Sequence, residues 1–343
     1  MTTARRWIAR LLLAAAGLVA AAGLAELAFR MVAPNGAPLI SQTWTPVEAI
    51  SQRARQSYRE AWGTFTYDDR GFRIGSGLPY ERSVLFIGDS FTEGRGVGDA
   101  DTFARAAERA LRDDGLQVRA LNAGQRGFGG AQELTVLRDV AAREPLDAIV
   151  LQVFPMNDLS DNLAYGGFGL DGDRLIAYDP PRPPWRARIS NLVGRTWLHD
   201  LAIARAANNS MLTGDAAAPY DTPEAQSLER ALLSEIVATA RAHQLPIVIL
   251  IVPTKLVQAV QRGLQADDGR GELQRFRATR DVVAALGVPW IDAGDVIPDL
   301  AADATTSDGG HFGPEGNRLV GEAIAARLAP LLRAQGDAAG HAS

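Results

Sequence analysis

The decisive stretch is SVLFIGDS, residues 83–90, in which four apolar residues are followed by glycine, aspartate and serine. A short apolar run that ends in glycine is typical of a buried strand in a parallel sheet. The glycine permits a tight turn, and the serine then stands at the start of a helix, where backbone N–H groups face a developing negative charge. Taken alone, Asp89 or Ser90 is also a common helix cap.

The same strand pattern recurs along the chain, alternating with helical patterns. Further strands are predicted at 117–121, 147–153, 246–252 and 288–291, and helices at 102–112, 132–143, 227–243, 271–286 and 314–333. Alternation of this kind indicates a parallel sheet covered on both faces by helices. We therefore predict an α/β protein, a three-layer α/β/α sandwich with a mainly parallel five-stranded sheet. Ligands of such sheets bind beyond the carboxyl ends of the strands.

The N-terminus carries Arg5, Arg6 and Arg10 ahead of an uncharged apolar run at 11–25. An uncleaved membrane anchor, a cleaved signal peptide and a buried soluble helix all fit this pattern, and we favour the anchor. Arginines before the run favour a cytoplasmic N-terminus, so the rest of the chain is expected on the extracytoplasmic, periplasmic side.

The expected organisation has four parts. Residues 1–33 form the anchor, 34–80 a linker that becomes an ordered extension around 61–73, 81–335 the α/β domain, and 336–343 a disordered tail. A long insertion at 163–223 interrupts the domain and is predicted to hold an apolar helix near 189–207. Its aromatic side chains are suited to stacking on sugar rings or to ordinary packing: Tyr165, Phe168, Tyr178 and Trp185.

Composition excludes several classes of function. The 343 residues carry a net charge of −5, with no basic run outside the N-terminus, so a nucleic-acid partner is not expected. Cysteine is absent, which removes disulfides, thiolate metal sites and a cysteine nucleophile. Carboxylates and histidines show no metal-ligand spacing, and we expect neither a metal nor another cofactor.

Three further polar sites follow predicted strands. Asp308 and His311 lie in a glycine-rich loop, and a histidine base oriented by a carboxylate is what a serine hydroxyl needs to become a nucleophile. The run NAGQRGFGG at 122–130 has glycines whose N–H groups can reach an oxyanion, and Asn157 offers a side-chain amide for the same purpose. Each has a plain alternative as a polar loop, a glycine turn or a cap.

Together these blocks resemble the SGNH/GDSL hydrolase family, over about residues 65–335. Ser90 matches the nucleophile, and Asp308 and His311 match the family's D-x-x-H pair. Gly127 matches the backbone oxyanion donor, with Gly124 as the alternative, and Asn157 the side-chain donor. The resemblance implies a flavodoxin-like fold. The local context is similar to a membrane-anchored bacterial branch, through residues 26–30, 69–73 and 158–162.

The resemblance implies a serine esterase that forms an acyl-enzyme through a Ser-His-Asp triad. Because export places the domain in the cell envelope, we expect it to hydrolyse an acyl ester, in particular an O-acetyl group, on a carbohydrate. Three alternatives remain open: an O-acetyltransferase with the same triad, a lipid-directed esterase, and a non-catalytic glycan-binding or assembly protein.

Overall fold

The computed structural model describes residues 3–32, 46–51, 53–60, 62–179, 181–182, 222–266, 271–303 and 310–340. The chain forms two compact units, one of residues 1–42 with 185–214 and one of residues 43–184 with 215–343. The predicted helix near 189–207, together with Trp185, lies outside the described residues.

The described part of the first unit is a single helix, α1 (Thr3–Val32). Its segment Arg5–Ala25 is long and apolar enough to cross a membrane. Large apolar side chains such as Leu12 and Leu13 remain exposed, so no described residue buries them. By length and composition this segment suits either a membrane span or a signal sequence.

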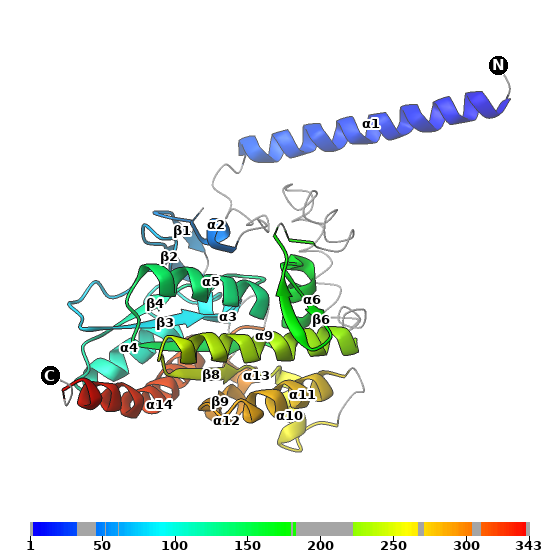
Figure 1. The fold of residues 1–343 in the computed structure, drawn as a ribbon. Helices are drawn as coiled ribbons and strands as arrows, with labels where there is room; N and C mark the ends of the chain where they lie inside the picture. The colour runs from blue at the N-terminus through cyan, green and yellow to red at the C-terminus, as the bar shows by residue number, and fades with distance from the viewer. Residues whose placement is uncertain are drawn as a thin grey trace. The chain divides into compact units, whose positions relative to one another are not determined.

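A parallel sheet of five strands forms the centre of the second unit (Figure 1). The strand order is β4 (Val118–Asn122), β3 (Arg82–Ile87), β5 (Ala148–Val153), β8 (Ile247–Ile251) and β9 (Trp290–Asp292). Every strand pair in this sheet is parallel. The predicted α/β fold class is confirmed, and each strand ends within two residues of its predicted limits.

The strand order places a ligand crevice next to β3. The chain moves from β3 outward to β4 and then returns to the other side of β3 as β5, with Val84 beside both Ala120 and Ala148. A reversal of this kind is where ligands bind in open α/β sheets, at the carboxyl ends of the two strands involved. The loops after β3 and β5 are therefore the expected walls of the site.

Helices cover both faces of the sheet. On one face α4 (Phe103–Asp113) and α14 (Pro314–Gly340) pack together over alternate strand residues such as Phe86, Val150 and Leu250. Because parallel connections are right-handed, the return from β4 to β5 places α5 (Gly130–Arg143) on the opposite face (Figure 1). The helices α9 (Pro223–Ala242) and α11 (Glu272–Ala285) continue that second layer.

Short helices follow the carboxyl ends of several strands. They are α3 (Ser90–Glu93), α6 (Asp158–Tyr165), α10 (Lys255–Gln261), α12 (Ala293–Val296) and α13 (Leu300–Asp303). Of the insertion, the structure describes α6 and an antiparallel hairpin of β6 (Phe168–Asp171) and β7 (Arg174–Ala177). The sequence patterns did not indicate this hairpin, because its strands are only four residues long.

Both ends of the α/β domain are more ordered than predicted. The N-terminal extension begins with α2 (Pro46–Ser51) and the hairpin β1 (Ser57–Glu60) and β2 (Gly63–Thr66), ahead of the predicted 61–73. The hairpin is held because Phe65 is fully buried, and Arg73 N–H donates to Asn122 O of β4 at 2.9 Å. At the other end α14 continues to Gly340, into the expected disordered tail, through an alanine-rich turn that favours helix.

Candidate active site

The turn that carries Ser90 is tightly constrained. Gly88 has φ +155°, and a Cβ there would lie 2.1 Å from Thr92 Oγ1, so only glycine fits. The buried Gln152 side chain of β5 closes the turn, because its Oε1 accepts from Asp89 N–H and from Thr92 Oγ1, both at 3.0 Å. Ser90 is therefore fixed at the N-terminus of α3 by its neighbours on two strands.

Ser90 and His311 meet across 221 residues of sequence. The distance between Ser90 Oγ and His311 Nε2 is 2.7 Å. His311 precedes α14, and its ring lies 4.7 Å from the Phe91 ring, which also packs against Phe154 and Phe312. A serine hydroxyl in hydrogen-bond contact with an imidazole is the arrangement that activates a serine nucleophile. Asp308, the predicted third member, lies outside the described residues.

The loop after β4 is joined to the nucleophile turn by backbone hydrogen bonds. Ala123 N–H donates to Phe86 O at 2.9 Å and Gln125 N–H to Gly88 O at 3.0 Å. Gly124 N–H is already used, because it donates to Asn122 Oδ1 at 3.1 Å. Among the described residues no acceptor is recorded for the N–H of Gly127, or for that of Ser90. Of these two glycine N–H groups, that of Gly127 is the one without an acceptor among the described residues.

Gly124 has a packing role instead. A Cβ at this position would lie 2.3 Å from Glu93 N and 2.6 Å from the Thr92 carbonyl carbon, so the loop rests directly on the backbone of α3. Asn122 Nδ2 adds a hydrogen bond to Thr92 O at 2.7 Å. The glycine-rich run thus combines one glycine that packs against α3 with another, Gly127, that has φ +72°.

The amide of Asn157 lies between two carboxylates. Its Nδ2 donates to Asp161 Oδ2 at 2.9 Å and to Asp89 Oδ2 at 3.3 Å. The first distance is that of an ordinary hydrogen bond, whereas the second lies beyond the usual 2.7–3.2 Å. The bond to Asp89 is therefore the weaker of the two.

Both of these carboxyls hold protons more tightly than usual. Burial raises the pKa of Asp89 to about 6, although the Phe91 N–H, the His311 charge and the Asn157 amide oppose the rise. Burial and the charge of Asp89 raise the pKa of Asp161 to about 7. The region around Asn157 therefore carries less negative charge at neutral pH than its composition suggests.

A buried acidic cluster extends from this point beneath α6. Burial raises the pKa of Glu229 to about 7, and burial with mutual repulsion raises the pKa values of Glu133 and Asp158 well above their usual range. Asn162 joins the cluster to α5 and α9, since it accepts from Ala131 N–H at 2.8 Å and donates to Glu229. Among the described residues no group of three or more His, Asp or Glu side chains is arranged to hold a metal ion.

Sequence reasoning missed Gln152 and Glu93. Gln152 is the single polar residue in the strand AIVLQV, which is a local sign of a function other than packing. Glu93 ends α3 with its side chain fully buried between two arginines, and nothing in the sequence identified those partners.

A family comparison decides the identity of this site. The model of the GDSL-like lipase/acylhydrolase family matches residues 86–319, which begin in β3 just before Ser90 and end in α14 just after His311. The chain belongs to the GDSL-like lipase/acylhydrolase family. As a GDSL-like enzyme it is a hydrolase of ester bonds. The N-terminal extension precedes the matched residues.

Solved structures of other esterases are similar to this GDSL-like chain. A lipase/acylhydrolase from Enterococcus faecalis is 16% identical, with 73% of this chain and 96% of that one covered and a TM-score of 0.42. The esterase EstA from Pseudoalteromonas sp. is 10% identical, with 74% and 100% covered and a TM-score of 0.42. Est24, a carbohydrate acetylesterase from Sinorhizobium meliloti, is 16% identical, with 73% and 100% covered and a TM-score of 0.36. No curated protein matches the chain by sequence.

Proposed function

We propose that the protein is a serine esterase with Ser90 as its nucleophile and His311 as its general base. The observation that carries this proposal is the 2.7 Å contact between Ser90 Oγ and His311 Nε2, at the carboxyl end of the strand where the sheet order reverses. Membership of the GDSL-like family supports the same chemistry.

In the proposed reaction His311 Nε2 accepts the proton of Ser90 Oγ as that oxygen attacks the ester carbonyl carbon. The carbonyl oxygen becomes an oxyanion, held by the backbone N–H groups of Ser90 and Gly127 and by the Asn157 amide. The alcohol leaves with the proton from His311, and water then hydrolyses the acyl-enzyme by the same steps in reverse. Asp308 would orient the imidazole and stabilise its charged form.

For the substrate we propose an acyl ester, in particular an acetyl ester, on a carbohydrate of the cell envelope. Support comes from α1, which is long and apolar enough to cross a membrane. The arginines ahead of its apolar run favour a cytoplasmic N-terminus and thus a periplasmic catalytic domain. The aromatic residues of the insertion add little, because Phe168 is buried and the rings of Tyr165 and Tyr178 lie against Gly167 and Gly169. Ordinary packing accounts for these three side chains.

A fluorophosphonate probe tests the nucleophile. Wild-type protein should be labelled and should hydrolyse p-nitrophenyl acetate, and Ser90→Ala should lose both properties. Ser234→Ala is the matched control, because this exposed serine on α9 donates its hydroxyl hydrogen bond to Arg230 O of the same helix. A Ser90→Ala protein that keeps esterase activity would overturn the proposal, and an unlabelled wild type would favour a non-catalytic binding role.

The acyl acceptor is tested separately, by measuring acetate released from O-acetylated polysaccharide. Preference for long-chain p-nitrophenyl esters would favour a lipid substrate instead. Transfer of acetyl to an added glycan without release of acetate would favour the O-acetyltransferase.

A further inference from the structure

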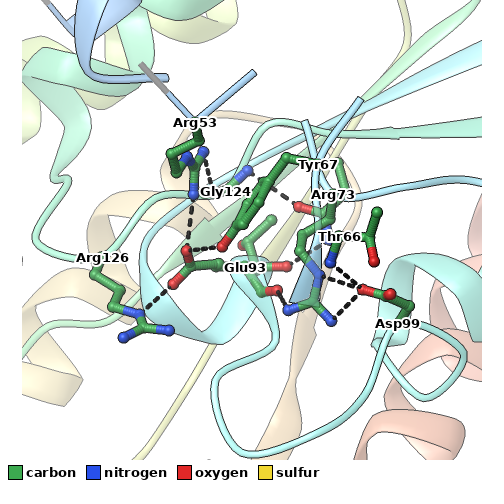
Figure 2. A network of polar contacts seen from close by, with 10 residues as sticks. Arg53, Thr66, Tyr67, Arg73, Glu93, Asp99, Gly124 and Arg126 are labelled. Carbon is green, nitrogen blue, oxygen red and sulfur yellow. Dashed lines mark hydrogen bonds and ion pairs between the residues drawn. The ribbon is translucent and has the colours of Figure 1, made fainter. Parts of the chain in front are cut away.

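The helix that carries Ser90 ends in a carboxylate that three other segments hold. Glu93 Oε1 accepts from Arg53 Nη1 and from Tyr67 OH, both at 2.7 Å, and Oε2 accepts from Arg126 Nε at 2.5 Å (Figure 2). The Glu93 side chain is completely buried, and that of Arg53 is only 2% exposed. Glu93 is therefore the centre of a buried network of ion pairs and hydrogen bonds.

The carboxylate stays charged in spite of its burial. Burial alone would raise the pKa of Glu93, but the charges of Arg126 and Arg53 and the Tyr67 hydroxyl outweigh it and bring the pKa to about 2. A buried charge with several directional partners is costly to break, because removing one partner leaves the others unpaired in a medium of low dielectric. The geometry of the network is therefore stiff.

The partners connect the two parts of the site that must stay in register. Glu93 is three residues after Ser90 on α3, and Arg126 immediately precedes Gly127. The ion pair between Glu93 and Arg126 thus joins the nucleophile helix to the loop with the proposed oxyanion N–H. Arg53 spans the same gap, since its Nη2 also donates to Gly124 O at 3.2 Å.

The N-terminal extension supplies the other side chains that hold Glu93, and we call the whole set of contacts the Glu93 clamp. Arg53 and Tyr67 both belong to the extension, and Arg73 adds a hydrogen bond from Nη1 to Glu93 O at 3.0 Å and an ion pair with Asp99 at 3.0 Å (Figure 2). All three residues precede the region matched by the family, which begins at residue 86. Side chains of the extension therefore contact both the side chain and the backbone of Glu93, and Arg73 also contacts Asp99 in the loop that follows α3.

We propose that Glu93 is a positioning residue that holds Ser90 and Gly127 in register, and that residues 53–73 form an integral part of the active-site scaffold. The inference rests on the proposed function, in which Ser90 attacks and Gly127 donates to the oxyanion. Misplacement of catalytic groups by about 1 Å costs up to about 100-fold in rate, so a clamp of this kind acts on kcat more than on substrate binding.

The test compares Glu93→Gln with Glu108→Gln in the full-length protein. Glu108 is a matched control, because its side chain is also fully buried and pairs with two arginines, Arg105 at 2.5 Å and Arg112 at 3.6 Å, on α4. Glu93→Gln should lower kcat for p-nitrophenyl acetate by about 10- to 100-fold with KM changed less than about 3-fold. Glu108→Gln should lower Tm by about as much as Glu93→Gln does, but it should leave kcat within about 3-fold of wild type.

Two further variants test the role of the extension. Arg53→Gln should lower kcat in the same way. The double variant with Glu93→Gln should lose less kcat than the product of the two single losses, because both substitutions remove the same ion pair. Tyr67→Phe keeps the ring and removes one hydrogen bond, and should lower kcat by about 2- to 5-fold. It serves as the decisive variant if Glu93→Gln fails to fold.

Several results would overturn the inference. They are a Glu93→Gln loss no greater than that of Glu108→Gln, a loss confined to KM, or a wild-type kcat in Tyr67→Phe. Ser90→Ala separates this failure from failure of the proposed function. If Ser90→Ala is inactive and unlabelled while Glu93→Gln behaves as the control does, only the positioning role is wrong.

Discussion

Replacement of Asn157 by alanine is the sharpest test of how the oxyanion is held. In the structure the amide has one ordinary hydrogen bond, to Asp161, and one long bond of 3.3 Å to Asp89. We expect the N–H that faces Asp89 to turn to the oxyanion in the transition state, while Asp161 keeps the side chain in place. Losing one such donor costs about 2.7–4 kcal/mol, which corresponds to a 10²- to 10³-fold lower kcat.

The assay is steady-state hydrolysis of p-nitrophenyl acetate, with urea unfolding of the same preparations. Asn162→Ala is the control, because Asn162 is a buried amide of the same cluster that binds Glu229 and Ala131 N–H and has no part in the proposed reaction. It should lose stability yet retain kcat within about 5-fold. If Asn157→Ala also loses less than about 5-fold in kcat, the Asn157 amide only neutralises its two carboxylates, and the assignment of an oxyanion donor is refuted.

Three further predictions concern the turn, the buried acids and the N-terminal helix. Gly88→Ala should lower the free energy of unfolding by about 2 kcal/mol or more in urea titrations, because φ is +155° and the new Cβ would collide with Thr92 Oγ1. The folded state binds protons more tightly at the buried acids with raised pKa values, so the free energy of unfolding should fall as pH rises from about 4 to about 7. Glu229→Gln should reduce the fall in the free energy of unfolding between pH 4 and pH 8 by on the order of 3 kcal/mol. An unchanged pH dependence would contradict the raised pKa of Glu229. Full-length protein should stay with membranes after an alkaline carbonate wash, and deletion of residues 1–32 should release it with unchanged kcat. A full-length protein in the soluble fraction at its intact mass would exclude the anchor.

The fold was predictable because its signals are local. Buried strands such as residues 148–153 and 247–251 are continuous apolar runs, and the helices between them show a regular spacing of apolar residues. Strands in this alternation place their carboxyl ends at one edge of a sheet, so the positions of Ser90 and His311 in the chain predicted that they belong to one site. The small hairpin of β6 and β7 has strands too short for such a signal.

The distribution of charge was not predictable in the same way. Arg53, Glu93 and Arg126 look like ordinary charged residues in the sequence, and their meeting depends on how the extension and two loops pack. Likewise only the folded loop shows that the Gly124 N–H already has an acceptor, whereas that of Gly127 has none among the described residues. The pKa values of Asp89 and Asp161 depend on burial and neighbours contributed by several elements.

The sequence by itself determined the parallel α/β sheet, the order of the polar blocks along it and the apolar N-terminal helix. Each of these follows from hydrophobic periodicity and composition over a few residues. Only the tertiary structure decided that the extension contacts α3 through Glu93. It also decided that the Asn157 amide lies between Asp89 and Asp161, two carboxyls with raised pKa values. The physical reason is that electrostatic and hydrogen-bond energies depend on distances between residues far apart in the chain, and those distances exist only after the core has packed.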